Sequence, residues 1–215
     1  MLLDATFVKE SLRRLSATKT DVFGAGGHGF SLNPPLLEIK VSEIEHRHNI
    51  QLPQEYRHFL TAIGNGGAGP FYGLFPWGKW DGAGRELETW AEAGDFVGIL
   101  SEPFPLMCAW NDLEGRPPSE LMDTNEEEYE RLLGEFERIY WDTARLNGAV
   151  PICTEGCALR IWLVLTGEQA GRLWRDDRAD DKGLAPLSLA DESPATFSRW
   201  YADWLEGALQ QARML

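Results

Sequence analysis

The sequence contains only three cysteines, Cys108, Cys153 and Cys157, and no apolar run that approaches the length of a bilayer-spanning segment. So few cysteines, in an odd number, exclude a disulfide-stapled miniprotein and suit a reducing compartment. The first ten residues are interrupted by Asp4 and lack the basic, apolar and small-residue regions of a secretory signal. We therefore expect a cytoplasmic protein with no membrane segment.

Positive charge is also scarce. The 215 residues include 20 Lys and Arg against 34 Asp and Glu, which gives a net charge of −14. Phosphate backbones and anionic lipid headgroups repel such a chain, so neither nucleic acid nor a membrane surface is an expected ligand. A basic protein partner is compatible with this charge. Hydrophobic residues at 43% and charged residues at 25% are ordinary values for a globular domain, so the chain can bury a sizeable core.

No complete motif for a cofactor or a metal is present. The spacing G-x-G-x-x-G occurs twice, but neither copy follows a strand and opens a helix, as a phosphate site requires. The two copies are Gly24/Gly26/Gly29 and Gly64/Gly66/Gly69. We therefore expect no dinucleotide and no other cofactor.

The candidate metal ligands are Cys153, Cys157, His46 and His48. The cysteine spacing is permitted for zinc, but two histidines separated by one residue on a helix point about 200° apart. No metal is expected. A Cys/His nucleophile pair stays open, because its partners need only be neighbours in space, although no local signature surrounds the cysteines. The acidic run 176–181 lacks the ligand spacing of a calcium loop, so it is expected to be a solvated turn.

Apolar periodicity and turn residues predict helices and strands in an order typical of an α+β fold with a mixed, mostly antiparallel sheet. Trp162 and Val164 give the central strand a second apolar face, so this strand is expected to be covered on both sides. The predicted helices are 1–16, 36–48, 53–63, 125–147 and a last one with Ser193 as its N-cap and Pro194 as its first residue. The predicted strands are 71–75, 150–152, 158–166 and 172–175.

Glycine and proline divide the chain. A glycine-rich stretch at 23–29 and the prolines Pro34 and Pro35 separate the first helix from the rest. Residues 1–33 are therefore predicted to be a helical extension with a flexible link, and residues 34–215 to be the main domain.

Four of the nine tryptophans fall in the irregular middle of the chain, among many acidic residues. Aromatic anchors surrounded by charged residues are typical of a protein-binding hot spot. The alternative is that these tryptophans are structural and pack beneath long loops. We predict that acids on the rim of this surface control the association rate and that the tryptophans control dissociation. The candidate partner-binding residues are Trp77, Trp80, Asp81, Glu86, Glu88, Trp90, Glu92, Asp95 and Asp112.

Two blocks of sequence stand out, in order, within about residues 36–206. The first block is Leu52-Pro53-Gln54-Glu55-Tyr56-Arg57-His58-Phe59-Leu60 followed by Gly64-Asn65-Gly66-Gly67-Ala68-Gly69-Pro70-Phe71-Tyr72-Gly73-Leu74-Phe75-Pro76. The second block is Ile152-Cys153, Gly156-Cys157, Thr166-Gly167, Gly171-Arg172-Leu173-Trp174, Asp176, Gly183 and Pro186. Together the two blocks resemble the SUKH superfamily of bacterial immunity proteins, which also includes a fungal cell-wall assembly regulator.

The resemblance implies a SUKH-like α+β fold with an N-terminal helix pair, a sheet and packed C-terminal helices. It also implies binding and neutralising of a cognate toxin, often a nuclease, with no catalytic residues and no small-molecule substrate. Ala158 departs from the pattern, because a glycine often follows the second cysteine. An acidic chain is the expected counterpart of a basic nuclease. Two alternatives are a regulatory or scaffold module for an endogenous protein, and a hydrolase that uses Cys or Asp.

Overall fold

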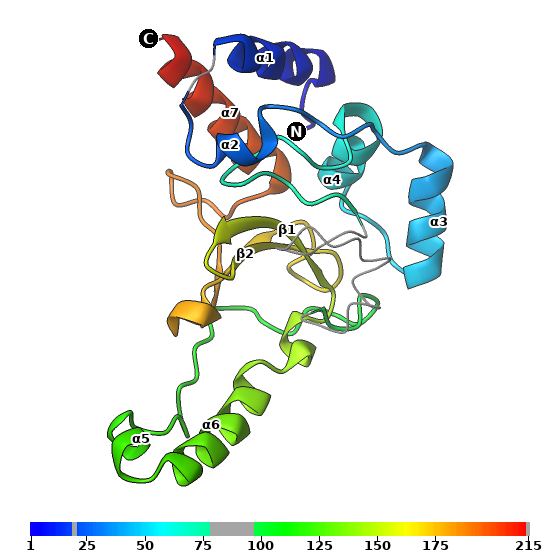
Figure 1. Cartoon of the computed structure of the whole chain (residues 1–215). Coiled ribbons are helices and arrows are strands. Elements are labelled where there is room, and N and C mark those ends of the chain that lie inside the picture. Colours follow the sequence, from blue (N-terminus) through cyan, green and yellow to red (C-terminus); the bar gives the residue numbers. More distant parts are fainter. Residues whose placement is uncertain (19–20, 78–96, 214–215) are drawn as a thin grey trace.

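The computed structural model describes residues 1–18, 21–77 and 97–213 and confirms the α+β class (Figure 1). The helices are α1 (Ala5–Thr18), α2 (Ala25–His28), α3 (Glu38–His48), α4 (Gln54–His58), the π-helix η1 (Phe59–Ile63), α5 (Glu120–Thr124), α6 (Glu126–Tyr140), the 3₁₀-helices η2 (Thr143–Leu146) and η3 (Arg178–Asp180), and α7 (Phe197–Arg213). The strands are β1 (Ala149–Gly156), β2 (Leu159–Val164), β3 (Leu173–Asp176) and β4 (Leu184–Pro186).

The sheet is four-stranded and antiparallel, with the strand order β1-β2-β3-β4. Pro151 lies in the edge strand β1, where a missing N–H is tolerated. On β2, Ile161 and Leu163 enter the main core, whereas Trp162 and Val164 enter a smaller core on the other face. The predicted cover on both sides of this strand is confirmed.

Helices α1, η1 and α7 build the main core on one face of the sheet. Phe59, Phe197 and Tyr201 are completely buried, and the ring centroid of Phe59 lies 5.1 Å from Phe197 and 5.2 Å from Tyr201. Val8, Leu12 and Leu15 of α1 belong to the same core, and α1 packs against α7. The boundary predicted after residue 33 stays a prediction, and the hydrophobic core extends across it.

The predicted start of the last helix is wrong. Helix α7 begins at Phe197 rather than at Pro194. The residues before it form isolated bridges instead, between Pro194 and Ser188 and between Thr196 and Arg172. These bridges satisfy backbone groups that a first helical turn would have left without partners.

The predicted strand 71–75 is also wrong. Phe71 has φ 53° and Gly73 has φ 96°, and strand residues do not adopt either value. Leu74 forms isolated bridges to Gly67 and to Cys153 of β1, and the N–H of Phe75 donates to the carbonyl of Ile152 at 2.9 Å. The segment therefore lies beside β1 as an irregular edge, although its aromatic residues favour a strand.

Gly66 is expected to be indispensable for the loop that precedes this edge. It has φ 78°, and a Cβ placed there would lie 2.7 Å from the backbone C and O atoms of Phe75. We predict that Gly66→Val lowers the free energy of unfolding by about 1–3 kcal/mol in urea denaturation. Gly26→Val is the control, because Gly26 lacks positive φ and a Cβ there meets nothing within 4 Å. Equal losses in the two variants would contradict the prediction.

The turn between β1 and β2 carries backbone strain at two residues that are not glycine. Cys157 and Ala158 have φ 47° and 66°, in the left-handed region that favours glycine. We predict that Ala158→Gly raises the free energy of unfolding by about 0.5–1 kcal/mol, because relief of this strain exceeds the added entropy of the unfolded chain. Exposed Ala109 has no positive φ, so Ala109→Gly should not stabilise. A loss of stability in Ala158→Gly would refute this assignment of strain.

Candidate functional site

The candidate surface predicted from the sequence is only partly visible. Trp80, Asp81, Glu86, Glu88, Trp90, Glu92 and Asp95 lie outside the described residues. Trp77 is half-buried against the main core, with its ring 6.3 Å from that of Tyr56. Its backbone N–H donates to Asn65 Oδ1 at 2.8 Å. Asp112 is exposed, and its carboxylate accepts the N–H of Glu114 at 3.0 Å. The predicted surface stays a prediction.

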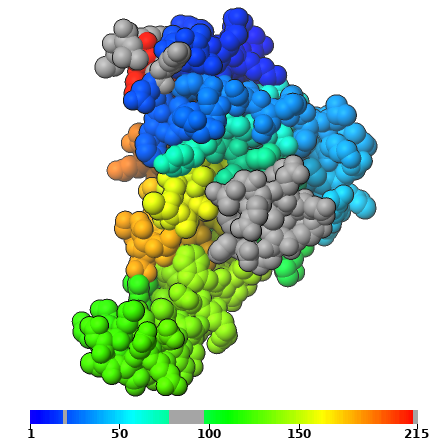
Figure 2. All heavy atoms as spheres, in the orientation of Figure 1, coloured from blue at the N-terminus to red at the C-terminus, as the bar shows by residue number. Residues whose placement is uncertain are grey.

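Helices α5 and α6 form a projection that we call the acidic arm, residues 120–140. It lies at the end of the molecule away from α1 and α7 and is visible as a separate lobe (Figures 1 and 2). The arm carries eight acidic residues against two basic ones. The acids are Glu120, Asp123, Glu126, Glu127, Glu128, Glu130, Glu135 and Glu137, and the bases are Arg131 and Arg138.

The sequence of α6 explains why this acidic helix forms. Asn125 is its N-cap, and Asn125 Oδ1 accepts the N–H of Glu128 at 3.3 Å. The acids of the first turn lie at the positive end of the helix dipole. Arg131 binds Glu128 at 2.7 Å and Glu135 at 2.6 Å, and its hydrogen bonds lower the pKa of the Glu128 carboxyl.

The remaining acids of α6 are available to a partner. Glu126, Glu127, Glu130 and Glu137 are exposed and form no ion pair with any residue of the described ranges. Met122 and Ile139 are also exposed on the arm, at 55% and 53%. Helical spacing from the buried Phe136 predicts that Ile139 lies on the packed face of α6, and its exposure shows that this prediction is wrong. The arm thus presents both negative charge and apolar side chains, a combination that suits a basic protein surface.

Aromatic packing fixes the base of the arm to the body. Tyr140 stacks on Phe136 at 5.0 Å and lies 5.4 Å from the ring of Trp110. Its hydroxyl donates to Asn111 Oδ1 at 2.9 Å, and the guanidinium of Arg145 covers Trp110 at 3.9 Å. Trp110, which the sequence places in the irregular middle, therefore anchors the arm.

A buried ion pair that the sequence pattern does not predict lies beside this base. Asp176 and Arg178 are 5% and 2% exposed, so the predicted solvated turn over 176–181 is wrong for both. Arg178 donates to the two carboxylate oxygens of Asp176 at 2.8 and 2.7 Å and to the carbonyl of Tyr140 at 3.3 Å. Its guanidinium lies 4.7 Å from the ring centroid of Trp141. The pair therefore joins β3 to the C-terminal end of α6.

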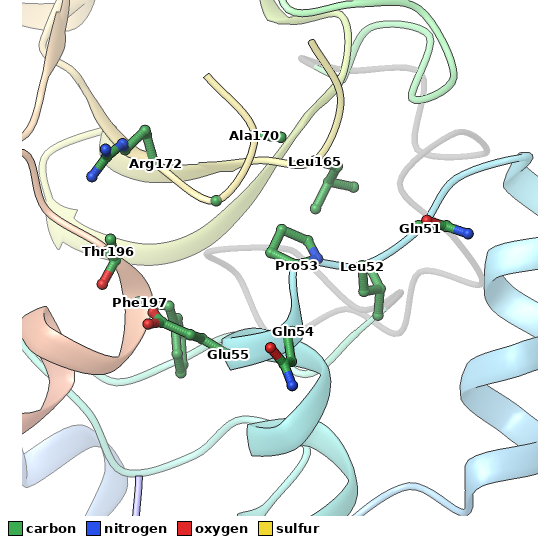
Figure 3. A pocket seen from close by; sticks show the side chains of 11 residues that line it. Gln51, Leu52, Pro53, Gln54, Glu55, Leu165, Ala170, Arg172, Thr196 and Phe197 are labelled. Atoms are coloured by element: carbon green, nitrogen blue, oxygen red, sulfur yellow. The ribbon is translucent and has the colours of Figure 1, made fainter. Parts of the chain in front are cut away.

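A pocket of about 550 Å³ lies where the two SUKH-like blocks meet (Figure 3). Its polar groups serve contacts within the protein. The Glu55 carboxylate accepts the N–H of Ser198 at 3.0 Å and lies 3.2 Å from the N-terminal amine of Met1. Arg172 donates to the carbonyl of Pro194 at 3.4 Å. We interpret this pocket as a junction that holds α4 against the start of α7.

The cysteines do not share one environment. Cys153 is buried, its thiol donates to the carbonyl of Pro70 at 3.2 Å, and burial raises its pKa well above the ordinary value. Cys157 is exposed in the turn after β1. Within residues 1–18, 21–77 and 97–213, no group of three or more His, Cys, Asp or Glu side chains is placed to hold a metal ion.

Comparison of the chain with protein-family models, with curated proteins and with solved structures gives no match. In the part of the chain that the structure describes, no helix has the length and apolar character required to span a bilayer. The resemblance to the SUKH superfamily stays a prediction, and the acidic arm is the feature on which a functional proposal can be built.

Proposed function

We propose that this chain is a bacterial immunity protein that binds a basic protein toxin in the cytoplasm and neutralises it without catalysis. The observation that carries this proposal is the acidic arm. It places eight acidic residues on a helical projection, and several of them are exposed and not engaged in ion pairs with described residues. The resemblance to the SUKH superfamily supports the same function.

The physical basis is complementarity of charge. A nuclease presents a basic surface to its polyanionic substrate, and a negatively charged projection competes for that surface. Arg131 bridges two successive turns of α6 through Glu128 and Glu135, so the helix meets its partner already ordered. Apolar side chains such as Met122 and Ile139 add area that is desolvated on contact.

The partner with which to test the proposal is a basic toxin domain, first of all one encoded by a gene adjacent to this one where such a gene is present. We expect co-expression to protect cells from the toxin, and the two proteins to co-purify in a complex that weakens as salt is raised. Survival without complex formation would contradict binding as the mechanism. A stable complex with an endogenous protein, and none with any toxin domain, would instead identify a regulatory module.

A further inference from the structure

A second cavity, of about 360 Å³, lies at the foot of the acidic arm. This volume falls within the range of binding pockets in proteins. Its walls come from the end of α6, the turn after β1, strands β2 and β3, and η3. They are Glu137, Trp141, Ala158, Arg160, Trp162, Asp176 and Ala179.

The charges of the cavity walls cancel. Asp176 is neutralised by its bidentate pair with Arg178. The other two charged residues, Glu137 and Arg160, have opposite signs. Arg160 is fixed to the hairpin by bonds from its guanidinium to Thr154 Oγ1 at 2.8 Å and to the Leu159 carbonyl at 2.9 Å. A charged guest of either sign therefore gains little here, and an uncharged guest is favoured.

The remaining walls are apolar and partly aromatic. Trp141 and Trp162 contribute indole rings, and Ala158 and Ala179 contribute methyl groups. Aromatic rings favour edge-to-face or offset contacts with a further ring. Glu137 lies near the end of the arm, and Trp141 is the C-cap residue that follows it. A partner drawn to the arm by charge would therefore have this cavity within reach.

We propose that the cavity receives an uncharged aromatic side chain of the basic protein that the arm attracts. This inference rests on the proposed function and gives each feature of the surface a separate role. The acids of the arm steer the partner, and the cavity holds one anchor residue of that partner. Anchors of this kind occupy desolvated pockets surrounded by polar residues and dominate the dissociation rate.

The preference of the cavity for an uncharged aromatic guest is tested with small molecules, in the absence of the partner. p-Cresol represents a tyrosine side chain, and butylammonium represents lysine. We expect p-cresol to shift the indole N–H resonance of Trp141 saturably in NMR titrations, with the resonance assigned by Trp141→Phe, and butylammonium to leave it unchanged. Ala179 is exposed on η3, so Ala179→Leu should fill the cavity without disturbing the fold and weaken p-cresol binding at least tenfold. Equal binding of the two probes, or undiminished p-cresol binding by Ala179→Leu, would overturn the proposal.

The role in recognition is tested with the toxin domain. We expect Ala179→Leu to raise the dissociation rate about 30-fold, which corresponds to a hot spot of about 2 kcal/mol, with little change in association. A normal dissociation rate in this variant would overturn the cavity assignment and leave the proposed function intact. Failure of the wild-type chain to bind any basic toxin domain would overturn the proposed function itself, even where p-cresol binds.

Discussion

Replacing Arg178 with methionine is expected to lower the free energy of unfolding by about 3–5 kcal/mol, because the substitution leaves the buried carboxylate of Asp176 without its partner. Both side chains are almost completely removed from water, and each Asp176 oxygen accepts from the guanidinium. The variant also loses the bond to the Tyr140 carbonyl and the contact with Trp141, so the base of the acidic arm should loosen. Urea denaturation measures the first effect, and hydrogen exchange of the α6 amides measures the second.

An exposed pair nearby supplies the control. Lys182 and Asp180 are 3.7 Å apart with side chains 68% and 47% exposed, so Lys182→Met should change the free energy of unfolding by about 1 kcal/mol at most. The double variant Asp176→Leu/Arg178→Met should recover much of the loss, because no unpaired charge remains buried. If Arg178→Met lowers the free energy of unfolding no more than Lys182→Met does, the ion pair does not stabilise the fold as described.

Removing the charge of three glutamates in the first turns of α6 is expected to slow association with the basic toxin domain about tenfold or more at low salt. The variant is Glu126→Gln/Glu127→Gln/Glu130→Gln, which changes acids that are exposed and not ion-paired with described residues. Stopped-flow association across a salt series is the measurement, and the difference from the wild type should shrink as salt rises.

The matched control removes the same charge from the opposite end of the molecule. Glu10 lies on α1, and Asp203 and Glu206 lie on α7, all of them exposed and remote from the arm (Figure 1). Glu10→Gln/Asp203→Asn/Glu206→Gln should change association by much less than the arm variant does. Equal slowing by the two variants would show that net charge alone, and not the arm, directs recognition.

Local pattern was sufficient to predict the elements whose packing follows simple periodicity. Alternation along 158–166 predicted β2 with both faces buried, and the spacing of Tyr56, Phe59, Leu60 and Ile63 predicted the helical segment formed by α4 and η1. Prediction failed where the backbone departs from that periodicity. Phe71 adopts positive φ within an aromatic run, and no feature of the run itself indicates this conformation.

The candidate site depends on contacts between distant residues, which a pattern does not reveal. The acids of α6 are evident in the sequence, but their place on a projection follows from the packing of Tyr140 on Trp110 and from the hydrogen bond to Asn111. Arg178 stands among acids, and such a run favours a solvated turn. Its burial depends on Tyr140 and Trp141, almost forty residues earlier in the chain. The one feature of the sequence that points to this buried ion pair is an arginine flanked by acids at the end of a strand.

The central claim is tested most directly by titrating the catalytic activity of the toxin domain with this protein. With the cognate basic nuclease domain, the wild-type chain should abolish cleavage at a stoichiometric ratio. The arm variant Glu126→Gln/Glu127→Gln/Glu130→Gln should require a large excess at low salt, and the α1/α7 control variant should inhibit like the wild type. Undiminished nuclease activity at saturating wild-type protein would contradict the account.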